Sequence, residues 1–187
     1  MRELALHLLD IAENSVAAKA KNITITVKED IVHDRLFMSV EDDGTGMDAE
    51  MVAKITDPFV TSRKTRKVGL GIPLLKEAAE ACNGYLKIES TLGKGTLLCV
   101  EFQRSHIDRM PLGDLACTLY GLVVAYPDIH FKFDYKVDKE EFNFDDAPIK
   151  TELKDVPLTD PLVLSFLREL LESGVANISP APAKVLG

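Results

Sequence analysis

The stretch DPFVTSRKTRKVGLGI, residues 57–72, combines dense positive charge with closely spaced glycines. Four of the five residues from 63 to 67 are basic, and Gly69 and Gly71 follow them just before a segment of helical character. Glycines that open a helix let the backbone approach an anion, which the free N–H groups of the first turn then bind. Lysine and arginine side chains on such a loop neutralise phosphates. The pattern predicts a polyphosphate ligand, and an ordinary solvated loop is the alternative.

A second glycine turn, DDGTGM, follows a segment rich in β-branched residues. Asp42 at the end of that segment, with Gly44 and Gly46 behind it, predicts a tight turn that admits a flat ring against the backbone. The Asp42 carboxylate can then accept a hydrogen bond from an exocyclic amine, as a nucleobase offers. An ordinary Asp-Gly turn and a calcium loop are the alternatives. The calcium loop is disfavoured because acids at alternate positions and a closing glutamate are missing.

The first segment of the chain predicts a helix with two polar side chains on one face. Asp10 and Asn14 are four residues apart, so that at about 100° per residue they point the same way. An asparagine oxygen suits Mg²⁺, which keeps several waters and bridges to substrate phosphates, and Asp10 can take a proton from an attacking water. A solvated helix face is the alternative. His7 on the same side is interpreted as structural or solvated.

Composition excludes several classes of protein. The chain of 187 residues is long enough for one domain with a small appendage, and 46% hydrophobic with 28% charged residues is typical of a globular protein. A net charge of −8 disfavours generic nucleic-acid binding, which needs a basic surface. No apolar run is long enough to span a membrane, and the N-terminus lacks the features of a signal peptide. Three widely spaced cysteines predict free thiols, and a cytoplasmic protein is expected.

Residues 1–104 show the periodicities of helices packed on a sheet. Helices are expected at residues 4–18, 48–54 and 72–82, and strands at residues 22–28, 35–41, 85–90 and 95–103. Asp48 can cap the second helix, and Asn83-Gly84 can end the third. The order predicts an α+β fold, a two-layer sandwich with helices on a mixed, largely antiparallel sheet.

Residues 105–187 contain no motif of known chemistry. A helix is expected at residues 112–126, strands at 129–137 and 141–145, and a last helix at 160–172 that stops at Gly174. We predict a small C-terminal α/β appendage, separate from the domain at residues 1–104, with an acidic face at residues 137–155. A docking surface for a partner and a plain solvated surface are both open interpretations.

In content and order, the motifs of residues 1 to about 102 resemble the GHKL family, whose ATP-binding Bergerat fold is shared by sensor histidine kinases, type II topoisomerases, mismatch-repair ATPases and anti-sigma-factor kinases. The resemblance implies that DIAENS is the N box, DDGTGM the first glycine box, DPFVTSRKT the start of a short lid over ATP, GLGI the second glycine box and GKGT the last box. It implies Asp10 as the catalytic base and Asn14 as the Mg²⁺ ligand. The ATP-binding residues that it implies are Asn14, Asp42, Gly44, Gly46, Met47, Ser62, Lys64, Lys67, Gly69, Leu70, Gly71 and Thr96.

Within this resemblance, Asp42 reads the adenine amine and Thr96 helps to hold the base. Two positions depart from the family pattern. Asp10 stands where the hydrolysing branches usually have glutamate, and its shorter side chain predicts slow turnover. Ala17 stands where histidine kinases commonly have lysine, which removes one phosphate contact. The chain begins inside the N-box helix, so no upstream helix pair with a phosphoacceptor histidine is expected.

The resemblance implies a Mg-ATP-dependent ATPase or protein kinase that acts on a partner protein, in the manner of anti-sigma-factor kinases. The rival hypothesis is a non-catalytic nucleotide sensor, a binding module whose lid orders on ATP and gates partner binding. A third hypothesis places the function in residues 105–187, with the ATP fold as its regulator. ATP and Mg²⁺ are the expected ligands, and neither nucleic acid nor a membrane is an expected partner. Dimers are frequent in the family, so a homodimer is considered beside a monomer.

Overall fold

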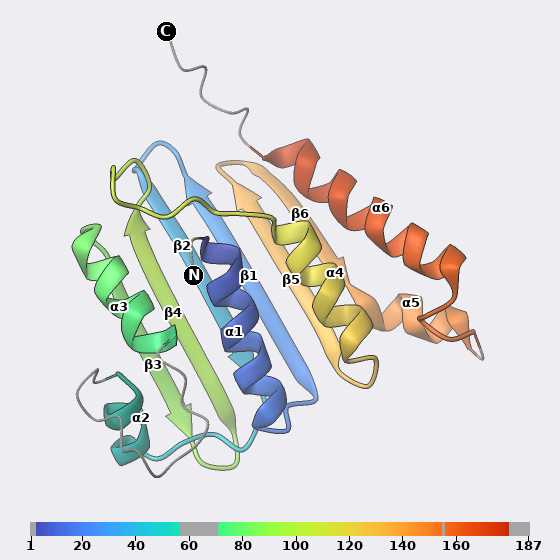
Figure 1. Cartoon of the computed structure of the whole chain (residues 1–187), viewed down its shortest axis with the longest axis horizontal. Helices are drawn as coiled ribbons and strands as arrows, with labels where there is room; N and C mark the ends of the chain where they lie inside the picture. The colour runs from blue at the N-terminus through green and yellow to red at the C-terminus, as the bar shows by residue number, and fades with distance from the viewer. Residues whose placement is uncertain (1–2, 57–70, 155, 180–187) are drawn as a thin grey trace, which may run out of the picture.

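The computed structural model describes residues 3–56, 71–154 and 156–179, and it places six helices beside six strands (Figure 1). The helices are α1 (Leu4–Ala17), α2 (Ala49–Thr56), α3 (Gly71–Ala81), α4 (Leu115–Ala125), α5 (Asp146–Leu153) and α6 (Pro161–Ile178). The strands are β1 (Asn22–Asp30), β2 (Arg35–Asp42), β3 (Tyr85–Thr91), β4 (Gly95–Gln103), β5 (His130–Val137) and β6 (Glu140–Asp145). Within the described ranges, every helix is too short or too polar to cross a membrane.

The strands form one sheet in the order β3-β4-β2-β1-β5-β6. Neighbouring strands are antiparallel except β1 and β5, which run parallel. Side chains alternate across the strands, so Ile23, Ile25 and Val27 of β1 are buried while Thr24 and Thr26 between them face the other way. Helices α1, α3, α4 and α6 lie on one face of the sheet (Figure 1). The predicted two-layer α+β fold with a mixed, largely antiparallel sheet is therefore confirmed.

Helix α1, which carries Asp10 and Asn14, begins without a side-chain cap. Two backbone carbonyls of the connection between β4 and α4 replace the cap: the Leu4 N–H donates to Pro111 at 2.9 Å, and the Ala5 N–H donates to Leu112 at 2.8 Å. These bonds satisfy first-turn donors that have no partner within the helix. The connection from β4 to α4 thus fixes the start of the helix that carries Asp10 and Asn14.

The same connection is anchored at one end of β1 by an ion pair between Arg104 and the buried Glu29 carboxylate. Glu29 is 8% exposed, and its two carboxylate oxygens accept hydrogen bonds from Arg104 Nε and from the Tyr135 hydroxyl, both at 2.7 Å. Burial, followed by the bond to Glu29, raises the pKa of Tyr135. The Glu29 charge is paired and hydrogen-bonded within the protein, as a buried carboxylate requires.

The C-terminal part extends the same sheet. Strand β5 pairs with β1 so that Phe131 lies beside Ile23 and Phe133 beside Ile25, and both phenylalanines are buried. Helix α4 contacts both α1 and α6, and the buried side chains of both parts belong to one hydrophobic cluster. One core thus extends across residue 104. The domain boundary at that residue stays a prediction.

The predicted end of the last helix is wrong. Helix α6 continues through Gly174 to Ile178. A Cβ atom at position 174 would overlap the Phe142 ring of β6, so this glycine provides room for helix-to-sheet packing instead of a C-cap. Helix α5 was not predicted; its first turn is capped by the Asp145 carboxylate through the Ala147 N–H. An aspartate followed by Pro148 in the first turn was the available signal.

Candidate functional site

A cavity of about 300 Å³ lies where the ends of β2 and β4 meet α1, α2 and α3. Most of its wall is apolar, with Ile11, Val40 and Ile88 among the lining residues. Its polar lining residues are Asn14, Ser15, Asp42, Thr45 and Thr96. An apolar cavity with a few convergent polar groups is the usual form of a small-molecule site.

Asp42 is the charged group of this cavity, and its carboxylate has a fixed orientation. The Ser15 hydroxyl donates to one carboxylate oxygen at 2.6 Å, and the Gly44 N–H donates to the other at 2.9 Å. A carboxylate has about four lone-pair sites, so two remain for a donor inside the cavity. The arrangement can bind an amine or amide N–H group of a ligand, as the sequence analysis expects for an adenine.

Thr96 lies directly beside Asp42, although the two are far apart in the sequence. The antiparallel register of β2 and β4 pairs them. The Thr96 hydroxyl is 2.8 Å from the Ser90 hydroxyl, which also accepts a hydrogen bond from the Met47 N–H at 2.8 Å. Ser90 therefore links the turn after β2 to the ends of β3 and β4 and holds Thr96 in place.

Two glycines allow the turns at this end of the sheet to pack closely. Gly46 has φ +64°, and a Cβ atom there would overlap the Thr91 carbonyl group. Gly95 has φ +115°, and a Cβ atom there would overlap the backbone of Asp42. Glycine is needed at both positions for the fold itself. At Gly44, too, a Cβ atom would come within 2.8 Å of a backbone atom, the Ala18 carbonyl oxygen at the end of α1.

The two polar residues of α1 take different positions. Asn14 lines the cavity, and its amide oxygen is a donor of the kind that Mg²⁺ takes beside waters and phosphates. Asp10, one turn earlier, is half-buried and is not part of the cavity wall. His7 is buried, and burial lowers its pKa.

The structure brings Asn14, Asp42, Gly46, Met47 and Thr96 together around one cavity. Gly71 begins α3, whose next residue, Ile72, also lines the cavity. The remaining predicted residues, Ser62, Lys64, Lys67, Gly69 and Leu70, lie outside the described residues.

Sequence reasoning missed Ser15 and Ser90, which orient Asp42 and Thr96. Ser15 follows Leu4, Leu8 and Ile11 on the buried face of α1. A polar residue at an apolar helix position was the available signal. Ser90 is the penultimate residue of β3, and its contact with the turn after β2 could not be inferred from local sequence.

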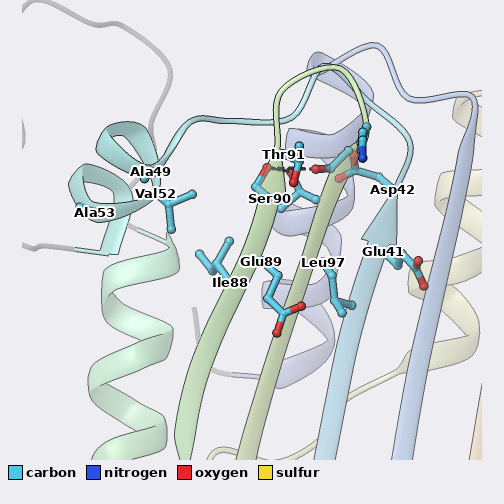
Figure 2. Close-up of a pocket in the computed structure, with 13 residues that line it drawn as sticks. Glu41, Asp42, Ala49, Val52, Ala53, Ile88, Glu89, Ser90, Thr91 and Leu97 are labelled. Atoms are coloured by element: carbon cyan, nitrogen blue, oxygen red, sulfur yellow. Dashed lines mark hydrogen bonds between the residues drawn. The ribbon is translucent and has the colours of Figure 1, made fainter.

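A larger hollow of about 720 Å³ adjoins the cavity at the tips of β3 and β4 (Figure 2). Figure 2 shows Val52 of α2 pointing toward Ile88 of β3 across it. The hollow shares Asp42 and Thr96 with the cavity, and its other charged lining residues are Glu41, Glu89 and Lys94. With more acids than bases, it is less suited to a polyphosphate than the side of the cavity formed by α1 and α3.

A family model described as "Histidine kinase-, DNA gyrase B-, and HSP90-like ATPase" matches residues 1–106. A putative sensor protein of Shewanella frigidimarina is 29% identical over 109 residues, which are 58% of this chain and 16% of that protein. Sporulation kinase C of Bacillus subtilis is 34% identical over 92 residues, 49% of this chain and 21% of the kinase. The chain thus spans about a fifth or less of the length of these relatives.

A solved structure shows the same fold. The N-terminal domain of a DNA repair protein superposes with a TM-score of 0.55 at 16% sequence identity, covering 76% of this chain and 52% of that one. At this identity the likeness concerns the fold alone. The superposition covers a larger share of the chain than the family match at residues 1–106. The likeness in fold therefore includes part of the C-terminal region.

Proposed function

Because the chain belongs to the family of histidine kinase-, DNA gyrase B- and HSP90-like ATPases, we propose that it binds Mg-ATP in the cavity beneath α1 and acts as an ATPase or protein kinase on a partner protein. The observation that carries the proposal is the Asp42 carboxylate, which Ser15 and Gly44 hold at the polar end of an apolar cavity. A cytoplasmic location and a homodimer stay predictions.

The cavity supplies what an adenine needs. Ile11, Val40 and Ile88 provide apolar walls for a flat ring, and Asp42 accepts from its exocyclic amine. Thr96, held by Ser90, provides a second hydrogen-bonding group beside Asp42. A guanine would present a carbonyl oxygen to Asp42 in the same pose, so this carboxylate favours adenine over guanine.

The phosphates would extend from the cavity along α1 toward the start of α3. Asn14 is proposed to hold Mg²⁺, which when bound neutralises charge on the phosphates. Gly69, Leu70 and Gly71 are proposed to present backbone N–H groups at the start of α3, and Ser62, Lys64 and Lys67 to bind phosphate oxygens. Asp10 is proposed to orient a water or a partner hydroxyl. In phosphoryl transfer such positioning and charge stabilisation account for most of the catalysis.

A nucleotide-sensing module without turnover is the second candidate. It is favoured by the residue at position 10, where aspartate replaces the glutamate of the hydrolysing branches and its carboxylate does not reach the cavity wall. In that case ATP would order the region around the cavity and change its affinity for a partner.

The deciding experiment follows ATP labelled on the γ-phosphate, with Mg²⁺ and purified protein, into free phosphate and into proteins of a source-cell lysate. Label in phosphate identifies an ATPase, and label on a lysate protein identifies a kinase. Asp10→Asn is expected to lower either rate by about 100-fold or more while leaving ATP affinity within about twofold. Glu13→Gln, an exposed carboxylate on the same helix, is the matched control. If ATP binds but its label stays on the nucleotide, the enzyme hypothesis is rejected and the sensor hypothesis remains.

A further inference from the structure

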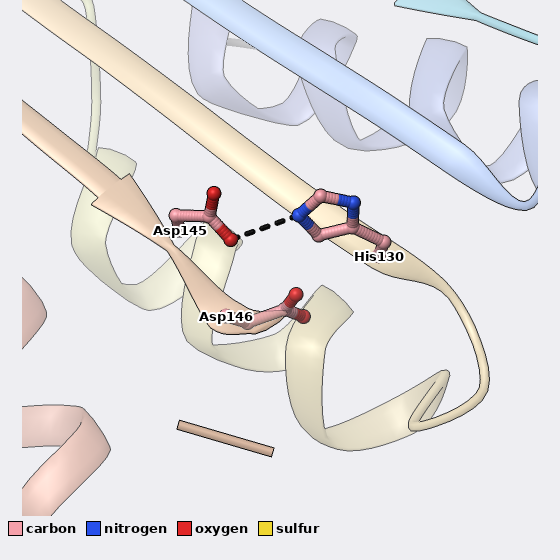
Figure 3. A group of neighbouring side chains, drawn as sticks. All are labelled: His130, Asp145 and Asp146. Atoms are coloured by element: carbon pink, nitrogen blue, oxygen red, sulfur yellow. Dashed lines mark hydrogen bonds and ion pairs between the residues drawn. The ribbon is translucent and has the colours of Figure 1, made fainter. Parts of the chain in front are cut away.

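His130, the first residue of β5, lies between two hydrogen-bond acceptors. Its Nε2 is 2.8 Å from the Asp145 carboxylate (Figure 3), and its Nδ1 is 2.9 Å from the Asn22 side-chain oxygen. The three residues belong to β5, β6 and β1, so the ring bridges three adjacent strands. A neutral imidazole donates through only one nitrogen.

The orientation of the Asn22 side-chain amide determines whether His130 Nδ1 must donate a hydrogen bond to it. The Asn22 amide nitrogen donates to the Asp43 carboxylate at 2.6 Å, which turns the Asn22 oxygen toward His130. Flipping the amide would set its oxygen against the Asp43 carboxylate and lose that bond. Both His130 nitrogens therefore face acceptors, and both bonds form only when the ring is an imidazolium.

The charges around His130 agree with a protonated ring. Asp146 is buried beside it (Figure 3). Lys150 Nζ pairs with Asp146 at 2.7 Å, and Lys132 Nζ lies 3.9 Å from Asp145. Asp145 and Asp146 each have one lysine partner, and a protonated His130 adds a positive charge 2.8 Å from Asp145. The same groups are spaced as metal ligands are, but the Lys150 ammonium already neutralises Asp146.

Asp43 connects this bridge to the candidate nucleotide site. Its carboxylate accepts hydrogen bonds from the Lys21 and Asn22 backbone N–H groups, at 2.7 and 2.9 Å, as well as from the Asn22 side chain. Burial acts to raise the pKa of Asp43, but these bonds outweigh it and lower the pKa. Asp43 directly follows Asp42 and precedes Gly44, whose N–H orients the Asp42 carboxylate.

We propose that His130 is a positioning residue for the nucleotide: as an imidazolium it holds Asn22, which holds Asp43 and so sets the turn that presents Asp42. The inference rests on the proposed ATP binding. When His130 loses a proton, a lone pair faces either the Asn22 oxygen or the Asp145 carboxylate, and one bond of the chain is lost. The contribution of His130 to nucleotide affinity is therefore expected to be present at about pH 6 and lost at about pH 8.5, since histidine is the side-chain type that changes charge between about pH 5 and 8.

The test measures Mg-ATP affinity by calorimetry at about pH 6 and about pH 8.5, for the wild-type protein and His130→Gln. ATP also titrates, so the quantity compared is the ratio of the two dissociation constants at each pH. We expect the wild type to bind about fourfold more tightly than His130→Gln at the lower pH, and equally at the higher pH. His33→Gln, an exposed histidine bonded to Asp30 at the other end of β1, is the matched control and is expected to leave the ratio at one throughout.

A second measurement uses the wild-type protein alone, in case the variant does not fold. Nitrogen-15 NMR of the His130 ring is expected to show a proton on both nitrogens at about pH 6, and at higher pH a larger doubly protonated fraction with Mg-ATP bound than without it. A ratio independent of pH, or a neutral ring at about pH 6, overturns the inference while ATP binding stands. A pH effect that a chelator removes would replace it with a metal site. Absence of ATP binding by the wild type at every pH would instead reject the proposed function.

Discussion

The paired strands β1 and β2 carry a carboxylate at each end, and the surroundings of the two carboxylates differ. At one end Glu29 is buried, and Arg104 and Tyr135 satisfy its carboxylate within the protein. At the other end Asp42 also accepts two hydrogen bonds, from Ser15 and Gly44, but its carboxylate lines a cavity. We refer to these as the closed end and the open end of the sheet.

The difference separates structural from functional use of a carboxylate. A buried carboxylate that is paired inside the protein stabilises the fold mainly because removing one partner leaves the other unpaired. A carboxylate oriented toward a cavity keeps lone pairs for a ligand. Substitutions at the closed end should therefore change stability, and substitutions at the open end should change nucleotide affinity.

The largest expected effect is that of Glu29→Ala at the closed end. It leaves Arg104 and the Tyr135 hydroxyl without their acceptor, and we expect a loss of about 3 kcal/mol in the free energy of unfolding, measured by urea denaturation. Glu101→Ala, which removes a more exposed partner of Arg35, is the control and should cost less than about 0.5 kcal/mol. Mg-ATP affinity of the folded Glu29→Ala protein should be unchanged. A parallel loss of affinity would show that the two ends are not independent.

Asp42→Asn at the open end should have the next largest effect. The amide loses the charge that strengthens the bond to the adenine amine, so we expect Mg-ATP affinity to fall about 30-fold by calorimetry. Glu41→Gln is the matched control, because Glu41 is exposed and lines the larger hollow without facing the cavity. If Glu41→Gln weakens binding and Asp42→Asn does not, the nucleotide occupies the larger hollow.

Ser15→Ala tests the orientation of Asp42 without changing its charge. Loss of one donor to the carboxylate is expected to weaken Mg-ATP binding about fivefold, with a small change in melting temperature. Ser39→Ala, at a buried serine in the middle of β2, provides the comparison for a lost hydroxyl away from the site. Equal affinities for both variants would assign Ser15 a purely structural role.

The smallest effect is expected for the change in stability when the pH is lowered. Hydrogen bonds from Ser105 and Gln103 lower the pKa of Asp34 at the closed end, as those from Asn22 and the backbone lower the pKa of Asp43 at the open end. Since both values lie below the ordinary 3.8, the stabilisation is complete above that pH and is lost as the pH falls through the folded-state values. Melting temperatures between about pH 5 and 2.5 should depend less on pH in Asp34→Asn than in the wild type. Identical slopes would contradict this assignment.

Much of the fold could be predicted because its signals are local. The alternation in residues 22–28 and the helical spacing from Leu4 to Ala18 place apolar residues on one face, and β1 and α1 form where these patterns predict them. Gly174 shows where local reasoning fails. A glycine that ends a helix and one that accommodates a neighbouring ring look alike in sequence, and only the position of Phe142 distinguishes them.

The candidate site likewise contains residues that could be predicted from the sequence and residues that could not. Asn14, Asp42, Gly46, Met47 and Thr96 could be named from their motifs, because each lies within a short segment of characteristic residue types. Ser15 and Ser90 could not be assigned, because a serine hydroxyl acquires its role from the group that it touches.

The sequence by itself determined the types of element, the family resemblance and the residues expected to bind ATP, since these depend on periodicity and on residue types at short spacing. Only the tertiary structure decided which distant residues meet: Thr96 beside Asp42 through strand register, and Glu29 with Arg104 and Tyr135. The same is true of His130, which reaches Asn22 only because β5 pairs in parallel with β1. Strand pairing joins residues that are far apart along the chain, and no local pattern encodes that choice of neighbour.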